Sequence, residues 1–357
     1  MIRPFGLQDV RLVHRLQRTG APLAIEHYLT HPRSPLRAAL VAQWAGPRVA
    51  TYVHVDRTGE GHNVGFLQLM QRPNRPEADL LFIAPATPND SAVWCELLQH
   101  SCVLASDQGV QRVYASPPDS AAQQECLRKA GFSPYTREVI YRLVGCPADG
   151  GPVAGFRSQE TRDTWTLQRL YLRSTPRLVQ QSEGALAGQA GSPPLSWWDP
   201  TRWEGVVWEP SGEVRAAVQV HRGRAGHWMR ILVSPDLSRE VARGLVEEGL
   251  HLLMRSAGRS GLALPIFASV RDYEVGLGDA LIAHGFAPYA DRVRMVKHTM
   301  SAARMTASSY PAAADKVIEA PARSQFWSAS SLAQRARGAC SAGEVDRIIG
   351  DATAKDY

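Results

Sequence analysis

Six ionisable residues beside predicted strands are the side chains of this sequence that could transfer protons. They are two carboxylates at the start of one strand, two imidazoles beside another, and a phenol and a carboxylate after a third: Glu77 and Asp79, His221 and His227, Tyr273 and Glu274. Such groups act as general acids and bases when they lie within hydrogen-bond reach of the reacting atoms. Spacing along the chain does not bring any of these pairs together, so the catalytic residues stay unknown at this stage.

The cysteines indicate neither a disulfide framework nor a metal site. Their number is odd, they are scattered, and none forms a C-x-x-C pair: Cys95, Cys102, Cys126, Cys146 and Cys340. We therefore expect reduced thiols, mostly in the core, and no bound metal. The first six residues lack the basic-then-apolar pattern of a secretory signal, and no apolar run approaches the roughly 20 residues of a membrane span. These features predict a cytoplasmic protein without a membrane partner.

The composition is that of a globular protein. Apolar residues make up 44% and charged residues 21% of the 357 residues, and the net charge is +6. The basic residues are mostly arginines interleaved with acids, without a block of like charge, which argues against nucleic acid as the main partner. At roughly 150 residues per domain, the length allows two domains and a remainder.

A duplicated segment shows how those two domains arise. Tyr114-Ala115-Ser116 and Gly131-Phe132-Ser133-Pro134-Tyr135 return as Phe267-Ala268-Ser269 and Gly285-Phe286-Ala287-Pro288-Tyr289. A repeat of about 150 residues fits a domain duplication better than a solenoid, whose period is roughly 20 to 50 residues.

The first unit has the pattern of an α/β domain. An N-terminal strand and helix precede a predicted hairpin of residues 49–55 and 64–70, because a turn-forming cluster separates two apolar, β-branched runs. A strand over 78–84 stops before Pro85, since proline cannot donate to a ladder. A helix over 91–106, a strand over 111–116, a helix over 120–130 and a strand over 137–144 complete this unit.

The second unit repeats that order. A helix that carries Trp165, Leu167, Leu170 and Tyr171 should stop at Thr175-Pro176, because the residue before proline avoids helical backbone angles. A hairpin of 206–208 and 214–220 follows, then a strand over 228–233 that runs into Pro235. A helix over 237–256, a strand over 265–269, a helix over 275–284 and a strand over 292–298 close the unit.

These patterns divide the chain into four parts. Residues 1–146 form the first domain, 147–155 a linker rich in turn residues, and 156–300 the second domain. Residues 301–357 are rich in alanine and serine with little periodic apolar content, so we predict that this tail is mostly disordered.

The order of elements and three recurring motifs resemble the GNAT superfamily of N-acetyltransferases. The motifs are an apolar-Gly-Phe strand, an apolar strand that runs into proline, and a helix that ends in Gly-Phe. In the first unit they are Val64-Gly65-Phe66-Leu67, Leu81-Phe82-Ile83-Ala84-Pro85 and Leu127-Arg128-Lys129-Ala130-Gly131-Phe132; in the second, Ile231-Leu232-Val233-Ser234-Pro235-Asp236 and Leu281-Ile282-Ala283-His284-Gly285-Phe286. The resemblance implies an α/β (α+β) fold of two tandem GNAT-like domains, each with a mixed, mainly antiparallel sheet flanked by helices.

The resemblance also implies a cofactor site. In that superfamily the pyrophosphate of acyl-CoA binds backbone N–H groups of a glycine-rich loop at a helix N-terminus, where the helix dipole favours an anion. Transferred to the second domain, the candidate cofactor-binding residues are Leu232, Val233, Ser238, Arg239, Glu240, Val241 and Ala242. Glu240 replaces the middle glycine of the family pattern, and Ala242 keeps the last small position. The first domain has no glycine over residues 86–94 and carries Trp94 near that last position, so we expect acetyl-CoA in the second domain.

The same loops also fit a simpler interpretation. Asp90-Ser91 and Pro235-Asp236 would then only end a strand and cap a helix, as any α/β fold requires. The tyrosine that often protonates the leaving thiolate in this family is replaced by Leu127 and Leu281, so the usual acid is missing from both copies.

Two functions from different classes therefore remain. The first is transfer of an acyl group from acetyl-CoA to an amine of a small molecule or peptide, with the second domain as the cofactor site. The alternative is a non-catalytic binding or interaction protein in which both cofactor loops have decayed. An open cleft at residues 239–242 favours the first function, and a cleft filled by side chains favours the second.

Overall fold

The computed structural model describes residues 1–45, 49–55, 64–73, 75–86, 91–145, 153–184, 203–261 and 264–299. All of these residues belong to one compact unit. Most of the predicted linker and the whole predicted tail lie outside the described residues. The boundaries of the two domains stay a prediction, and the two copies are named here by their elements.

The first copy runs from β1 to β7, and the elements that the sequence predicted follow one another in the expected order. Its elements are β1 (Ile2–Pro4), α1 (Val10–Leu16), β2 (Ala21–Pro22), α2 (Ile25–Thr30), α3 (Pro35–Ala45), β3 (Val49–Val55), β4 (Val64–Gln71), β5 (Glu77–Ala84), α4 (Ser91–Asp107), β6 (Arg112–Ala115), α5 (Ala121–Lys129) and β7 (Ser133–Leu143). The sequence did not predict β2, α2 and α3, which are the short elements between α1 and β3.

The second copy repeats this order from β8 to β13. Its elements are β8 (Phe156–Ser158), α6 (Thr164–Ser174), α7 (Arg177–Ser182), β9 (Trp203–Trp208), β10 (Ala216–Arg222), β11 (His227–Val233), α8 (Arg239–Gly261), β12 (Ile266–Arg271), α9 (Leu277–Ala283) and β13 (Ala287–His298). Helix α6 ends at Ser174, and Thr175, directly before Pro176, is already extended, as predicted. The closing strands β7 and β13 start four to five residues earlier than predicted.

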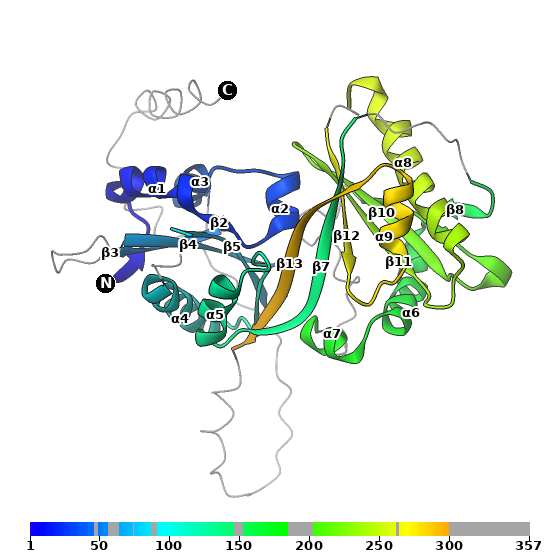
Figure 1. The fold of residues 1–357 in the computed structure, drawn as a ribbon. Helices are drawn as coiled ribbons and strands as arrows, with labels where there is room; N and C mark the ends of the chain where they lie inside the picture. The colour runs from blue at the N-terminus through cyan, green and yellow to red at the C-terminus, as the bar shows by residue number, and fades with distance from the viewer. Residues whose placement is uncertain are drawn as a thin grey trace, which may run out of the picture. The chain divides into compact units, whose positions relative to one another are not determined.

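The two copies share one continuous sheet instead of the two sheets that were expected. Its order is β1-β3-β4-β5-β6-β13-β7-β12-β11-β10-β9-β8, with β2 attached to β5. The closing strands are exchanged: β13 of the second copy pairs with β6 of the first, and β7 of the first pairs with β12 of the second. Figure 1 shows β7 and β13 running side by side between the two copies. Each copy supplies only one closing strand, and local sequence cannot specify which neighbour that strand pairs with.

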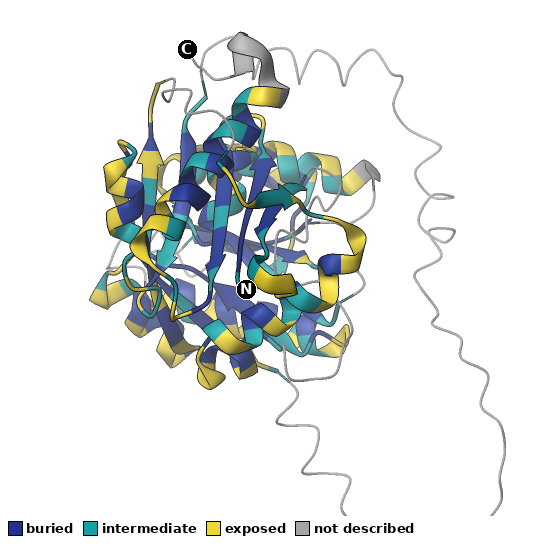
Figure 2. Cartoon of the chain, turned by 90° about the vertical axis from the view of Figure 1, so that its right-hand side faces the viewer, coloured by how far each residue is buried: buried dark blue, intermediate teal, exposed yellow. Residues whose placement is uncertain are grey.

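Helices cover both faces of this sheet. In the first copy α4 and α5 lie on one side of β3, β4 and β5, and α1 and α3 lie on the other (Figure 1). In the second copy α8 and α9 cover one face and α6 the other. Figure 2 shows buried residues concentrated along the sheet and exposed residues on the outer faces of the helices. The expected class, a mainly antiparallel sheet flanked by helices, is confirmed.

A matching ion pair near the start of each copy confirms the duplication at atomic detail. Arg3 donates two hydrogen bonds to Asp9, at 2.6 and 2.7 Å, and Arg157 donates two to Asp163, at 2.7 and 2.8 Å. Each aspartate also accepts a hydrogen bond from a backbone N–H three residues earlier. Because Arg157 donates to Asp163, the pKa of Asp163 is lower than usual.

Equivalent positions of the two closing strands carry opposite charges where these strands meet. Glu138 of β7 and Arg292 of β13 are separated by 154 residues, the spacing of the repeat, and they are direct partners in the β7–β13 ladder. Both side chains are buried. Ser116 donates a hydrogen bond to one carboxylate oxygen of Glu138 at 3.3 Å, and Arg294 donates to the other oxygen at 2.8 Å. The junction between the copies is therefore held by buried, paired charges as well as by backbone hydrogen bonds.

Candidate functional site

Each copy contains one pair of neighbouring strands that run parallel and then separate. In the first copy β5 and β6 pair over Glu77 to Asp79 and Arg112 to Tyr114. In the second, β11 and β12 pair over His227 to Met229 and Ile266 to Ala268. The space between the strands beyond these pairs is called here the first gap, between β5 and β6, and the second gap, between β11 and β12. A gap of this kind exposes backbone groups that need hydrogen-bond partners.

The first gap is filled by the chain itself. Strand β2 pairs with β5 through Ala21 and Pro22, opposite Ile83 and Phe82. The N–H of Leu23 then donates to the carbonyl of Leu81 at 2.9 Å, while the N–H of Ser116, which follows β6, donates to the carbonyl of Leu23 at 2.7 Å. The segment around β2 therefore bridges both sides of the gap and satisfies their backbone groups.

Side chains close the first gap further. Gly20 packs so tightly that a Cβ placed on it would lie 2.2 Å from the ring of Phe82. Arg292, from the exchanged strand β13, donates to the carbonyls of Pro22 and Ser116 at 3.2 and 3.1 Å. Trp94 is buried at the start of α4 and donates to the carbonyl of Pro85 at 2.5 Å. A ligand could enter the first gap only by displacing this segment.

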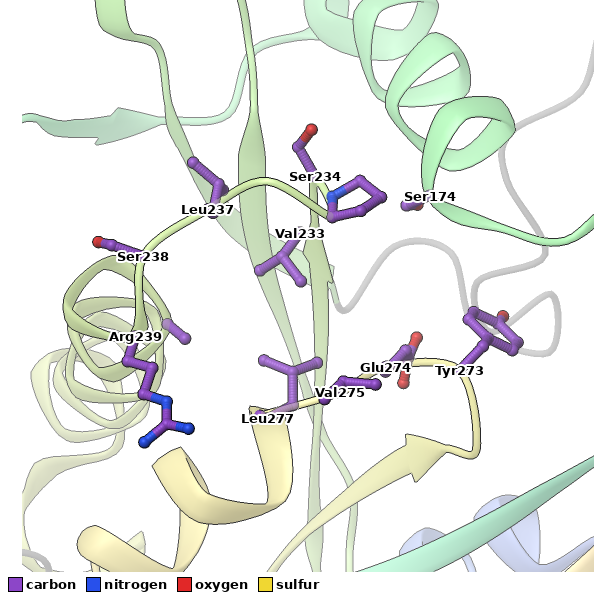
Figure 3. A pocket seen from close by; sticks show the side chains of 13 residues that line it. Ser174, Val233, Ser234, Leu237, Ser238, Arg239, Tyr273, Glu274, Val275 and Leu277 are labelled. Atoms are coloured by element: carbon purple, nitrogen blue, oxygen red, sulfur yellow. The ribbon is translucent and has the colours of Figure 1, made fainter.

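The second gap is open. It contains a cleft of about 180 Å³ between the end of β11, the start of α8 and the loop between β12 and α9. The lining residues are Ser174, Val233, Ser234, Pro235, Leu237, Ser238, Arg239, Ala242, Tyr273, Glu274, Val275, Gly276 and Leu277. Figure 3 shows Ser238 and Arg239 on one side of the cleft, and Tyr273 and Glu274 on the other. This volume is below the roughly 300 to 1,000 Å³ of pockets that enclose a whole drug-sized ligand, so the cleft has room for only part of such a ligand.

The start of α8 presents donors to this cleft. The hydroxyl of Ser238 caps the helix by accepting a hydrogen bond from the N–H of Val241 at 3.4 Å. Within the described ranges the N–H groups of Arg239 and Glu240 have no acceptor. The helix dipole adds partial positive charge at this end, and the Arg239 guanidinium adds a full one. This wall is therefore suited to bind an anion.

The loop before α8 is fixed by polar contacts. Asp236 accepts hydrogen bonds from Ser234 and from Arg215, and these contacts lower the pKa of its carboxyl. The N–H of Ser234 donates to the carbonyl of Arg215 at 2.9 Å. Asp236 is thus held by its neighbours on the β10 side, and its charge is balanced by Arg215 rather than facing the cleft without a partner.

The structure brings four of the seven predicted cofactor-binding residues to the cleft. Val233, Ser238, Arg239 and Ala242 line it, whereas Leu232, Glu240 and Val241 do not. Leu232 is buried against α6, since alternate residues of a strand face opposite sides of the sheet. Val241 packs on the core beneath α8, and the Glu240 side chain is exposed.

The opposite wall carries the ionisable groups Tyr273 and Glu274. Arg271, at the end of β12, donates a hydrogen bond to the phenol oxygen of Tyr273 at 2.7 Å. The backbone N–H of Arg271 donates to one carboxylate oxygen of Glu274 at 2.8 Å. Burial raises the pKa of both Tyr273 and Glu274. A phenol and a carboxylate therefore face the cleft opposite the helix terminus.

A buried ion pair lies behind this wall. Arg271 donates to both oxygens of Glu183, with the shorter contact at 2.6 Å, and Tyr171 donates to Glu183 at 2.6 Å. Burial alone would favour the neutral acid, but Arg271, together with Arg230 and Arg294, outweighs it and lowers the pKa of Glu183 to about 2. Glu183 is thus ionised and holds Arg271 in place.

Sequence reasoning missed Glu183, Arg271 and Tyr171. Glu183 lies after α7, a six-residue helix with no clear periodicity, and it meets Arg271 across 88 residues of chain. The sequence offered one signal for Arg271: it lies two and three residues before Tyr273 and Glu274, which were already candidates.

The other ionisable candidates do not line the cleft. Glu77 and Asp79 bind Arg72 at 2.8 and 2.7 Å, so they form a buried ionic cluster of the first copy. The His221 ring packs against Trp203 and His31 at centroid distances of 5.1 and 5.3 Å. His227 is buried at the start of β11, on the paired side of the gap.

Three further observations on the described residues concern the position of the usual acid, metal binding and membrane spanning. Leu127 and Leu281 are fully buried in the cores of their copies, so neither helix offers an acid at the position where the family often has tyrosine. Among the residues that the structure describes, no cluster of three or more His, Cys, Asp or Glu side chains could hold a metal ion. In the same ranges, no helix combines the length and apolar character needed to cross a membrane.

Comparisons with known proteins give structural matches only. Protein-family models yield no match to the sequence, and neither do curated protein sequences. Among solved structures, a GCN5-related N-acetyltransferase from Sphaerobacter thermophilus is similar over 84% of this chain and 95% of its own, with 14% identity and a TM-score of 0.51. A tandem GNAT protein from the clavulanic acid biosynthesis pathway matches 84% of this chain and 98% of its own, with 17% identity and a TM-score of 0.48. An acetyltransferase of the GNAT family from Colwellia psychrerythraea matches 84% and 99%, with 14% identity and a TM-score of 0.40.

Proposed function

We propose that this chain, which has the GNAT fold, transfers an acyl group from acyl-CoA to an amine of a small molecule or peptide in its second copy. The observation that carries this proposal is the contrast between the two gaps. The first gap is bridged by β2, and the second contains an open cleft beside a helix N-terminus. One active site per chain follows from this contrast.

The lining of the second cleft fits an acyl-CoA substrate. The free N–H groups at the start of α8 and the Arg239 guanidinium would bind the pyrophosphate, because they supply donors and positive charge without a loop glycine. Val233, Leu237 and Leu277 give the cleft an apolar wall for the pantetheine arm. Glu240 does not obstruct this arrangement, since its side chain is exposed and does not line the cleft.

The chemistry requires a neutral amine. Acyl-CoA supplies an activated thioester carbonyl, which an amine can attack only after losing a proton. Glu274 faces the cleft, and burial raises its pKa, which makes it a stronger base than a surface carboxylate. We assign to Glu274 the removal of this proton from the amine.

The non-catalytic alternative retains support in the first copy. There the gap is filled, and the loop before α4 contains no glycine. In this proposal the first copy is a scaffold that contributes strand β7 beside β12, while binding and chemistry take place in the second copy.

Calorimetric titration of the purified chain with acetyl-CoA and with CoA tests the proposal. We expect binding in the micromolar range with one site per chain, and we expect Arg239→Glu to abolish it. Arg243→Glu is the matched control, because it makes the same charge change on the same helix at an exposed residue that does not line the cleft. Absence of heat and of thermal stabilisation at millimolar ligand would refute acyltransferase function and leave the binding protein.

A further inference from the structure

A small groove lined by arginines opens beside the cleft of the second copy. Arg169 and Arg173 of α6 line it, together with Arg215, which directly precedes β10, and Ser234, which follows β11. Ser234 also lines the cleft, and so does Ser174, the neighbour of Arg173 at the end of α6 (Figure 3). The groove has a volume of about 20 Å³, which leaves room for one small group of a ligand. It is called here the arginine groove.

The arginine groove carries more positive than negative charge. Arg173 donates a hydrogen bond to Glu213 at 2.5 Å, and Arg215 donates one to Asp236. Both ion pairs are accessible to solvent, and each guanidinium has further N–H donors for another acceptor. Arg169 is exposed and, within the part of the chain that the structure describes, forms no ion pair or hydrogen bond. Three arginines against two carboxylates therefore leave one positive charge unbalanced.

One of these arginines occupies a position that belongs to the apolar core of the first copy. The strand pairs β4–β5 and β10–β11 are equivalent, and β5 and β11 end before the equivalent prolines Pro85 and Pro235. Counted from these prolines, the registers of the two pairs make Arg215 the equivalent of Phe66. Phe66 is fully buried and stacks on Phe82 at a centroid distance of 5.7 Å. A charge thus stands where the fold itself requires only an apolar side chain.

Of the two arginines on α6, only one has a basic equivalent. The repeat spacing of 154 residues relates Arg169 to Arg15, but it relates Arg173 to Thr19. The first copy therefore has one arginine where the second has three. The three arginines come together in the copy that has the open cleft.

The arginine groove and the start of α8 lie on different sides of the cleft. Helix α6 covers one face of the sheet, and α8 covers the other. If the pyrophosphate of acyl-CoA binds at the start of α8, the second substrate has to reach the thioester from another direction. The arginine groove joins the cleft at Ser234 from the α6 side. It is therefore placed to bind the acyl acceptor.

We infer that the acyl acceptor carries a carboxylate in addition to its amine, and that the arginine groove binds this carboxylate. This inference rests on the proposed function. Arg169 supplies the unbalanced charge, and a guanidinium donates two parallel hydrogen bonds to a carboxylate, which orients it. The amine then lies in the cleft beside Glu274. Arg169 precedes Arg173 by one helical turn, about 6 Å, so the amine and the carboxylate are several bonds apart. An amino acid with a side-chain amine and a short peptide both have this spacing.

Two derivatives of CoA test this inference without knowledge of the acceptor. In both, the sulfur carries a linear chain of about six carbon atoms, long enough to extend from the cleft to Arg169. The chain ends in a carboxylate in one derivative and in a neutral carboxamide in the other. By calorimetry, the wild-type chain should bind the carboxylate about tenfold more tightly than the carboxamide.

Arg169→Gln should abolish this preference. The variant should fold normally, because Arg169 is exposed. Arg15→Gln is the matched control, since it makes the same change at the equivalent exposed residue of the first copy, and it should keep the tenfold preference.

The outcomes separate this inference from the proposed function. If CoA itself does not bind, the proposed function fails. If CoA binds, but the carboxylate is not preferred or is still preferred by Arg169→Gln, the assignment of the groove is refuted while the cofactor site stands. CoA also carries a phosphate on its ribose, so dephospho-CoA is a further comparison. If Arg169→Gln weakens binding of CoA but not of dephospho-CoA, the groove binds the cofactor phosphate and the inference about the acceptor is overturned.

Discussion

The two gaps of this sheet have the same position in the fold and opposite contents. Asp163 follows Asp9 by 154 residues, and Pro176 follows Pro22 by the same number, so the two prolines are equivalent. After Pro22 the chain stays extended through Leu23 and inserts between β5 and β6. After Pro176 a helix starts at once, and none of the described residues that follow it inserts between β11 and β12. The backbone is extended after Pro22 and helical after Pro176, and this local difference accompanies the filled gap of the first copy and the open gap of the second.

This comparison shows how a duplicated fold can divide its roles. Backbone groups of separated strands need partners in either copy, and the first copy supplies them from its own chain. Each such hydrogen bond contributes only about 0.5 to 1.5 kcal/mol when made, but leaving the groups unpaired and buried costs more. The filled gap is therefore a stable structural solution, and the open gap is the one that a ligand can complete.

The largest effect should come from filling the second gap. Ala242→Trp places an indole on the first turn of α8, where Ala242 lines the cleft. We expect a loss of more than about 100-fold in affinity for CoA, because the indole would occupy volume in the cleft that the ligand needs. Calorimetry measures the affinity, and a thermal melt checks that the variant is folded. Unchanged affinity in a folded variant would show that CoA does not bind in this cleft.

Removing the proposed base should lower the turnover rate by a similar factor and leave the affinity for the cofactor nearly unchanged. Glu274→Gln keeps the shape and the hydrogen bond from the Arg271 N–H, but it cannot accept a proton. We expect kcat to fall about 100-fold with little change in KM for acetyl-CoA. Glu213→Gln, at an exposed carboxylate outside the cleft, is the control. Equal losses in both variants would contradict the assignment of Glu274.

Disturbing the filled gap should reduce stability rather than binding. A methyl group on Gly20 would overlap the ring of Phe82, so Gly20→Ala should lower the free energy of unfolding by about 2 kcal/mol. Gly6→Ala is the control, since a Cβ there has no neighbour closer than 3.6 Å. Urea unfolding compares the variants. A stability equal to wild type in Gly20→Ala would show that β2 is not tightly held in the first gap.

Acidification should weaken the segment that follows β2. Burial, with His31 and Arg33 nearby, lowers the pKa of His27 in α2 to about 4 from a usual value of about 6.5. The folded chain then binds fewer protons than the unfolded chain, so stability is lost as the pH falls below about 6.5, and the loss levels off below about 4. Allowing for partial exposure, we expect about 2 kcal/mol.

The variant His27→Gln isolates this contribution. Urea unfolding at pH 7 and at pH 4.5 should show a smaller loss in His27→Gln than in the wild type. Equal losses would mean that His27 titrates in the folded chain as it does in the unfolded chain.

Most of the local structure could be predicted from the sequence, whereas its long-range pairing could not. Apolar runs that stop at Pro85 and Pro235 predicted β5 and β11, and turn clusters predicted both hairpins. The exchange of β7 and β13 depends on pairing partners far apart in the chain, which strand patterns do not encode. The insertion of β2 depends on two residues, too few for a periodic signal.

The candidate site was predictable to a similar extent. The motif before α8 identified Val233, Ser238, Arg239 and Ala242, which line the cleft. Tyr273 and Glu274 were candidates without a known neighbour. Their relation to each other became clear only through Arg271 and Glu183, because a buried ion pair between distant segments leaves no local pattern.

The opposite charges of Glu138 and Arg292 bear on how the two halves can assemble. These residues occupy equivalent positions and face each other across the approximate two-fold axis that relates the exchanged strands. A symmetric homodimer of the first copy would bring two buried Glu138 carboxylates together. A symmetric homodimer of the second copy would bring two buried Arg292 guanidinium groups together. Each half is therefore complementary to the other and incompatible with itself. Duplication has converted what symmetry would make a self-association surface into a joint that closes within a single chain.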